Sequence, residues 1–305
     1  MKYLITLIMA LLSSLFLNAD HRSAHLSAAE VPAPPALEEE FFFTNPSSGA
    51  KLWGKVYYPR EVNGGKKCPG LVFVPGGKGF GSQLQRGGPR GGPMDFVREG
   101  FIVMIFDPDG RGRSGGEENL GGFVHQDGLH ALLLKLAASP YVDKSNIGVF
   151  TSSLGIAIGA GAVGRYPGSP SVRYLIDDEG PCDRFYITKF DDPRFVGMLG
   201  HTTSDGDWWN EREAYRYIAS FPGMYLRIQK VRDHVHGENK GHALKMIEYA
   251  TAKKYGGKGK CCWTRMNGKE NRPDTLFTEK NPPRWLSNEE GRAAGLRFVK
   301  ELRGK

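Results

Sequence analysis

A serine followed two residues later by glycine stands in the run TSSLG at residues 151–155. A small residue two before and two after a serine lets a strand turn sharply into a helix and hold the hydroxyl outward as a nucleophile. The register selects Ser153, because centring on Ser152 would put the bulky Phe150 and Leu154 at the flanking positions. The alternative is an ordinary strand-to-helix junction in which Ser152 caps the helix.

The segments around this turn alternate between two periodicities. Short β-branched or aromatic runs predict buried strands, and longer runs with apolar residues at helical spacing predict helices. An extended pair at residues 40–58 precedes them, and a closing helix follows at 287–302. Strands are expected at 70–74, 101–106, 147–150, 172–176, 224–231 and 261–265, with helices at 93–99, 124–138, 154–165 and 241–255. Such alternation is typical of a parallel sheet covered by helices.

Two loops that follow predicted strands are rich in glycine. The first, PGGKGFGS at 75–82, has no phosphate-loop spacing, so we expect it to expose a backbone N–H toward a pocket instead. The second is DPDGRGRSGG at 107–116. Two further features follow these loops along the chain: the TSSLG turn, and the run MYLRIQKVRDH at 224–234, in which an acid follows a strand. In the order of these four features the sequence resembles the α/β-hydrolase superfamily over residues 40–303.

The resemblance implies an α/β-hydrolase fold, with a mostly parallel central sheet, helices on both faces and the site at the carboxyl ends of the strands. It implies that Ser153 is the nucleophile and that the backbone N–H of Leu154, with one from Gly77 or the next residue, binds the oxyanion. It also implies that Asp233 orients the base. The acids that end the preceding strand are an alternative for that role: Asp177, Asp178 and Glu179.

The chain departs from the superfamily in its general base. That base is a histidine after the last strand, whereas this chain has no histidine beyond His242. We expect His242 to take its place. His201, in the predicted cap, and His234 and His236, beside Asp233, are alternatives. The remaining alternative is that no base is present.

The loop at residues 233–242 also gathers possible metal ligands, because it contains a His-x-His pair next to an acid. It lacks HExxH spacing, and one loop seldom supplies a full coordination shell. We therefore expect no metal and no cofactor, and keep a metal-dependent hydrolase as a minor alternative. A protein that binds a ligand under the cap without catalysis is the other alternative, motivated by the missing late histidine.

The first residues predict export. An apolar run at 4–17 follows Lys2, as in a signal peptide of residues 1–19, and a Pro- and Glu-containing leader follows at 20–39. The hydrolase domain would then span 40–305, with a cap insertion at about 181–221, and the mature chain would be secreted or periplasmic without a stable membrane span. Its four cysteines permit one or two disulfides in such an exported chain.

Composition and charge limit the classes of binding partner that can be expected. The net charge of +8 is spread along the chain and no aromatic and basic motif accompanies it, so nucleic-acid binding is not expected. The sequence thus predicts an exported serine hydrolase that cleaves a carboxylic ester or related acyl bond of a small molecule. It leaves the oligomeric state open.

Overall fold

A computed structural model of the chain describes residues 37–86, 92–230, 232–251 and 288–303. All of them belong to one compact unit, residues 32–305. The expected signal peptide at 1–19 and most of the leader lie outside the described residues, as do the expected strand at 261–265 and its two cysteines. None of the described helices is long and apolar enough to cross a membrane.

The described strands form one sheet in the order β1-β2-β4-β3-β5-β6-β7. The strands are β1 (Glu38–Thr44), β2 (Lys51–Tyr57), β3 (Cys68–Val74), β4 (Ile102–Phe106), β5 (Val142–Ser152), β6 (Tyr174–Asp178) and β7 (Met224–Ile228). The pairs β1–β2 and β2–β4 are antiparallel. The pairs β4–β3, β3–β5, β5–β6 and β6–β7 are parallel. All parallel strands therefore end at one edge of the sheet, where polar side chains can converge.

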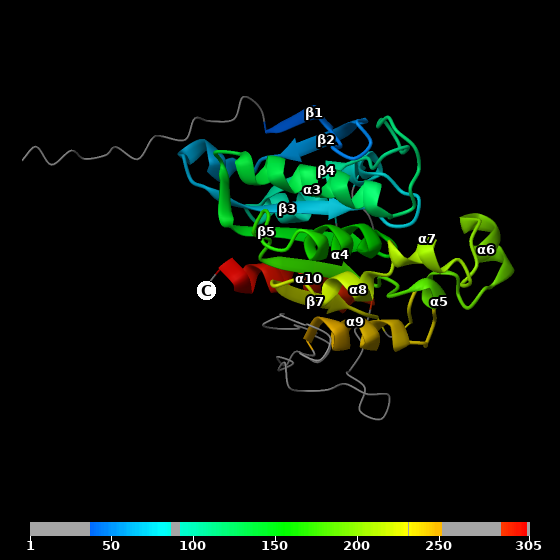
Figure 1. The fold of residues 1–305 in the computed structure, drawn as a ribbon. Coiled ribbons are helices and arrows are strands. Elements are labelled where there is room, and N and C mark those ends of the chain that lie inside the picture. Colours follow the sequence, from blue (N-terminus) through cyan, green and yellow to red (C-terminus); the bar gives the residue numbers. More distant parts are fainter. Residues whose placement is uncertain (1–36, 87–91, 231, 252–287, 304–305) are drawn as a thin grey trace, which may run out of the picture. The chain divides into compact units, whose positions relative to one another are not determined.

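Helices cover both faces of the sheet (Figure 1). Side chains alternate along β3, so that Val72 and Val74 join one buried cluster and Leu71 and Phe73 the other. The first cluster contains residues of α3 (Phe123–Ala138), α4 (Gly155–Arg165), α8 (Ala214–Ile218) and α9 (Gly241–Thr251). The second contains residues of α2 (Pro93–Arg98) and α10 (Asn288–Arg303).

Short helices lie between β6 and β7, in the segment expected to form a cap. They are α5 (Arg184–Ile187), α6 (Pro193–Leu199), α7 (Gly206–Asn210) and α8. Ala214 and Ile218 of α8 belong to the main core, whereas α5, α6 and α7 lie beyond the carboxyl ends of the parallel strands (Figure 1). Ile187, Leu199 and Trp209 form a separate buried group with Leu154 packed against it, called the cap cluster below. Through Leu154 this cluster joins the cap to the turn after β5.

Candidate active site

Ser153 sits at the sharp turn between β5 and α4, where its backbone φ is +50°. A left-handed conformation costs a non-glycine residue roughly 1–3 kcal/mol and persists only where the surroundings enforce it. Here a close approach of backbones enforces it. A Cβ on Gly155 would come within 2.6 Å of the Pro75 carbonyl oxygen, and one on Gly76 within 2.5 Å of the Ser152 carbonyl oxygen. The small flanking residues thus allow the glycine loop to press against the turn.

Ser153 and Glu179 occupy equivalent positions at the ends of adjacent strands. The last paired residues of β5 and β6 are Ser152 and Asp178, and the ladder continues one step as Ser153 N–H donates to the Asp178 carbonyl at 2.8 Å. Glu179 N–H in turn donates to the Ile228 carbonyl of β7 at 3.0 Å. Glu179 also has a positive φ, +57°. Sheet register therefore sets the two side chains side by side.

His234 connects these two residues. Its Nε2 lies 3.0 Å from Ser153 Oγ and its Nδ1 lies 3.0 Å from Glu179 Oε2. Because an ionised carboxylate only accepts hydrogen bonds, Nδ1 carries the ring proton and donates it to Glu179, which leaves Nε2 to accept from the serine hydroxyl. The His234 side chain is 29% exposed, whereas that of Glu179 is 1% exposed. The result is the arrangement of nucleophile, base and orienting acid that acyl transfer requires.

A buried lysine shares the carboxylate with His234. Lys230 follows β7, and its Nζ lies 2.9 Å from Glu179 Oε2 and 3.1 Å from Asp178 Oδ1. Burial by itself would raise the pKa of Glu179, but the hydrogen bond from His234 and the positive charge of Lys230 outweigh it and lower that pKa. Glu179 is therefore ionised at neutral pH. Sequence reasoning did not single out Lys230, which lies inside the strand expected at 224–231.

Asp233, the expected acid, is occupied elsewhere. Its Oδ1 accepts the backbone N–H groups of Val235 and His236 at 2.8 and 2.9 Å, and its Oδ2 accepts from Gln229 Nε2 at 2.9 Å. Burial opposes ionisation, but these hydrogen bonds hold the pKa of Asp233 below its usual range. Its Oδ1 is 3.7 Å from His234 Nδ1, farther than Glu179 Oε2. In this position the carboxylate shapes the turn that presents His234.

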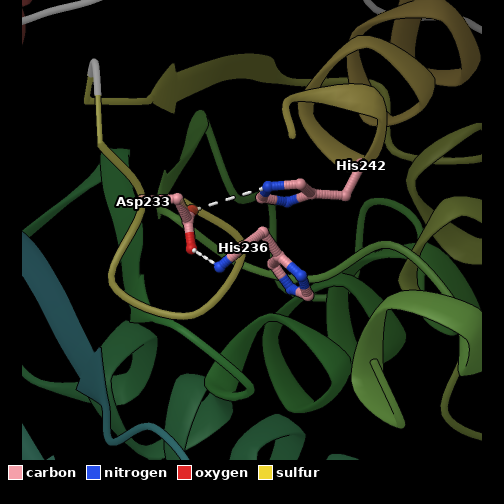
Figure 2. Close-up of side chains that lie close together, drawn as sticks. All are labelled: Asp233, His236 and His242. Atoms are coloured by element: carbon pink, nitrogen blue, oxygen red, sulfur yellow. Dashed lines mark hydrogen bonds and ion pairs between the residues drawn. The ribbon is translucent and has the colours of Figure 1, made fainter. Parts of the chain in front are cut away.

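His242, the expected base, does not meet the serine. It is fully buried in α9, where Arg227 Nη2 donates to its Nδ1 at 2.9 Å. The Gly180 carbonyl oxygen lies 3.1 Å from the same Nδ1, and Nε2 lies 3.5 Å from Asp233 Oδ2. Figure 2 shows the ring directed at Asp233. Burial, with the charge of Arg227 next, lowers the pKa of His242 well below its ordinary value. His242 stays in the core because α9, the helix that carries it, packs against the sheet.

Two other histidine candidates also lie away from the serine oxygen. His201 stacks on Trp208 in the cap at a ring-centroid distance of 3.8 Å, with Nδ1 3.1 Å from Asp205 Oδ2. His236 lines the same cavity as Ser153, but its ring lies against Tyr186 and His242, with centroids 5.4 and 4.7 Å away. Of the histidines considered as bases, His234 is thus the one that the fold places against Ser153.

Two sets of side chains bring possible metal ligands together. Asp233, His236 and His242 form one, and Glu179, Asp233 and His234 the other, with ligand atoms within 4.8 Å of one another. In the first set, the positively charged guanidinium of Arg227 lies 2.9 Å from His242 Nδ1 and would repel a cation bound to the same ring. The second set includes His234, whose Nε2 already contacts Ser153 Oγ. Neither arrangement favours a metal over the proton chemistry of His234.

The glycine loop faces the serine and is anchored from behind. Arg111 Nη1 donates to the carbonyl oxygens of Gly77 and Gly79 at 2.9 and 3.0 Å, and Arg111 is itself held by Glu118 at 2.7 Å. Gly77 has φ +54° and lines the cavity with Ser153 and Leu154. Because the peptide unit is planar and trans, the N–H following the Gly77 carbonyl points away from Arg111. The loop is thus fixed with backbone groups available beside the serine.

Comparison with solved structures identifies the fold. An esterase from Pyrococcus furiosus superposes with a TM-score of 0.59 at 16% identity, over 87% of this chain and 91% of that one. An α/β-hydrolase from Penicillium gives 0.53 at 14% identity, over 70% and 86%. A dipeptidyl aminopeptidase IV candidate from Bacteroides ovatus gives 0.56 at 19%, over 71% of this chain but 31% of that chain, so this chain spans about a third of its length.

No protein-family model matches the sequence, and no curated protein matches it. The structural likenesses and the sheet order nevertheless confirm the expected fold: the chain has the α/β-hydrolase fold, with a mostly parallel mixed sheet and helices on both faces. The likeness to these structures, each under 20% identical, concerns the fold.

Proposed function

We propose that this chain is a serine hydrolase that cleaves a carboxylic ester or related acyl bond through Ser153, His234 and Glu179. The observation that carries the proposal is the unbroken pair of 3.0 Å contacts from Ser153 Oγ to His234 Nε2 and from His234 Nδ1 to Glu179 Oε2. The strained backbone of Ser153 supports it, since such strain in this fold serves to expose a nucleophile.

The reaction follows from these contacts. Ser153 Oγ attacks the acyl carbon while its proton passes to His234 Nε2, and the imidazolium that forms is stabilised by the Glu179 carboxylate. The tetrahedral intermediate collapses when Nε2 returns that proton to the leaving alcohol, which leaves an acyl-serine. Water then attacks the acyl carbon, gives its proton to Nε2, and releases the acid as Ser153 recovers its hydrogen.

The oxyanion would be held by the N–H of Leu154, with a second N–H from the loop at Gly77. Both residues line the cavity at Ser153, and Leu154 directly precedes helix α4, whose N-terminal dipole favours negative charge. One preorganised donor of this kind contributes about 3–4 kcal/mol to lowering the barrier. Arg111 would serve the site indirectly by fixing the loop.

In the proposed triad both partners of the serine come one strand earlier than in the usual order. The acid follows β6, the strand beside the nucleophile strand, and the base follows β7. The shift leaves a working geometry because β5, β6 and β7 are neighbours whose ends are in register. It also removes the need for a histidine after a later strand.

The experiment is labelling with a fluorophosphonate, which forms an adduct only with an activated serine. We expect one adduct per chain, located on Ser153 by peptide mass spectrometry. Ser153→Ala should abolish labelling and ester turnover, whereas Ser152→Ala, the matched control one residue away, should keep both. Labelling that survives Ser153→Ala would contradict the proposal, and ligand binding without turnover would favour the non-catalytic alternative.

We also propose that the protein is exported and acts outside the cytoplasm. The apolar run at residues 4–17 after Lys2 supports this. Expression of the full chain should yield a mature protein that begins near residue 20, as measured by intact mass. A product in the periplasm or medium that retains residues 1–19 would contradict the predicted cleavage.

A further inference from the structure

We infer that the pocket beside Ser153 accepts an uncharged, apolar acyl group, so that the substrates are esters of neutral aliphatic acids and not of acids that bear a carboxylate or an amine. This inference rests on the proposed function, and it names the substrate class of the same site.

The pocket lies between the turn at Ser153 and the cap. Its cavity volume is about 130 Å³, below the range of about 300–1,000 Å³ for drug-sized ligands, so it suits a small acyl group. One wall is the cap, and its lining residues come from α5 and α6: Tyr186, Ile187, Phe195, Met198 and Leu199. The body contributes Gly77, Leu154, Pro181 and Val235.

The walls are held in place by packing. Ile187 and Leu199 are 7% exposed and belong to the cap cluster, against which Leu154 and Phe195 pack. Lys78 Nζ donates to the Met198 carbonyl at 3.3 Å, which ties the glycine loop to α6. The apolar surface therefore keeps a fixed position relative to the serine, as selection among acyl groups requires.

The described lining residues offer no charged group free to pair with a charged substrate: burial lowers the pKa of His236, and His234 is held between Ser153 and Glu179. No lysine or arginine is among its described lining residues, and its one carboxylate is Glu179. Both oxygens of Glu179 are engaged: Oε2 by His234 and Lys230 Nζ, and Oε1 by the Lys230 backbone N–H at 3.3 Å. A free amino group of a peptide would thus find no available acceptor of opposite charge, and a substrate carboxylate would be desolvated without a partner.

Chain length gives the first arm of the test. With p-nitrophenyl acetate, butyrate and hexanoate, kcat/KM should rise about fourfold for each added methylene until the pocket is filled, the factor expected for burying one methylene. The second arm uses esters of matched length that carry a charge, p-nitrophenyl hemisuccinate and the p-nitrophenyl ester of β-alanine. Each should react at least about a hundredfold more slowly than the butyrate ester.

A charge placed in the pocket should reverse part of this preference. Met198 lines the pocket and is 54% exposed, so Met198→Lys should fold and should raise the hemisuccinate-to-butyrate ratio of kcat/KM at least tenfold. Phe185→Lys is the matched control: Phe185 is an exposed apolar cap residue, 48% accessible, outside the lining, and its replacement should leave the ratio as in the parent.

The outcomes separate this inference from the proposed function. If the fluorophosphonate labels Ser153 but the charged esters react as fast as the butyrate ester, or acetate is preferred over longer chains, the apolar-acyl inference is overturned and the hydrolase stands. An unchanged ratio in Met198→Lys also overturns it. If Ser153 is not labelled and no ester is cleaved, both fail together.

Discussion

Exchanging the two candidate acids separately tests which of them orients His234. Glu179→Gln keeps the shape of the side chain but removes the charge, and Asp233→Asn does the same at the other position. The Glu179 carboxylate lies 3.0 Å from His234 Nδ1, whereas the Asp233 carboxylate lies 3.7 Å away and accepts two backbone N–H groups. An asparagine can accept the same two N–H groups through its carbonyl oxygen, so the turn should persist.

The expected losses differ by orders of magnitude. A glutamine would keep its carbonyl oxygen toward His234 Nδ1, because Lys230 Nζ donates to the same position, so what is lost is the negative charge that stabilises the imidazolium. Loss of an orienting acid by such a substitution lowers kcat by about 10⁴, which corresponds to about 5 kcal/mol of barrier. We therefore expect Glu179→Gln to lose about 10³–10⁴ in kcat/KM, and Asp233→Asn to lose less than about tenfold, the effect of a longer-range charge near the imidazolium.

The assay is ester turnover at pH 8, with circular dichroism and thermal unfolding as checks that each variant is folded. The reasoning is refuted if Asp233→Asn loses as much activity as Glu179→Gln while both remain folded. In that event Asp233, the acid expected from the superfamily resemblance, would orient His234 despite the longer distance between them.

Two further predictions concern buried charge. Lys230→Met removes a positive charge that lowers the pKa of Glu179, so that pKa should rise and the acid limb of the kcat/KM profile should move to higher pH. An acid limb at the same pH as in the parent would leave Lys230 a purely structural role. Burial, with the charge of Arg111 next, lowers the pKa of His125 to about 4. The unfolded chain, in which histidine titrates near 6.5, therefore binds more protons as pH falls below about 6.5, and the free energy of unfolding should drop by about 2 kcal/mol between pH 7 and 5. Urea titrations should find this slope reduced in His125→Gln, and an identical slope would show that other groups cause it.

Much of the fold could be read from the sequence because it depends on local patterns. The periodicity of 124–138 predicts a helix, and α3 spans Phe123–Ala138. The small residues around Ser153 indicate a close approach, which the glycine loop makes. These features are local, since a strand, a helix or a tight turn is decided by residues within a few positions of one another.

The partners of Ser153 were harder to choose, because the acids at 177–179 and 233 and the histidines at 201–242 all follow strands or lie in the cap. The sequence by itself determined that a serine, several acids and several histidines would reach one edge of a parallel sheet. Only the tertiary structure placed Glu179 and His234 in contact with each other and turned His242 into the core. The reason is that sheet register and loop curvature position side chains to within an ångström, and both depend on contacts between segments far apart in the chain.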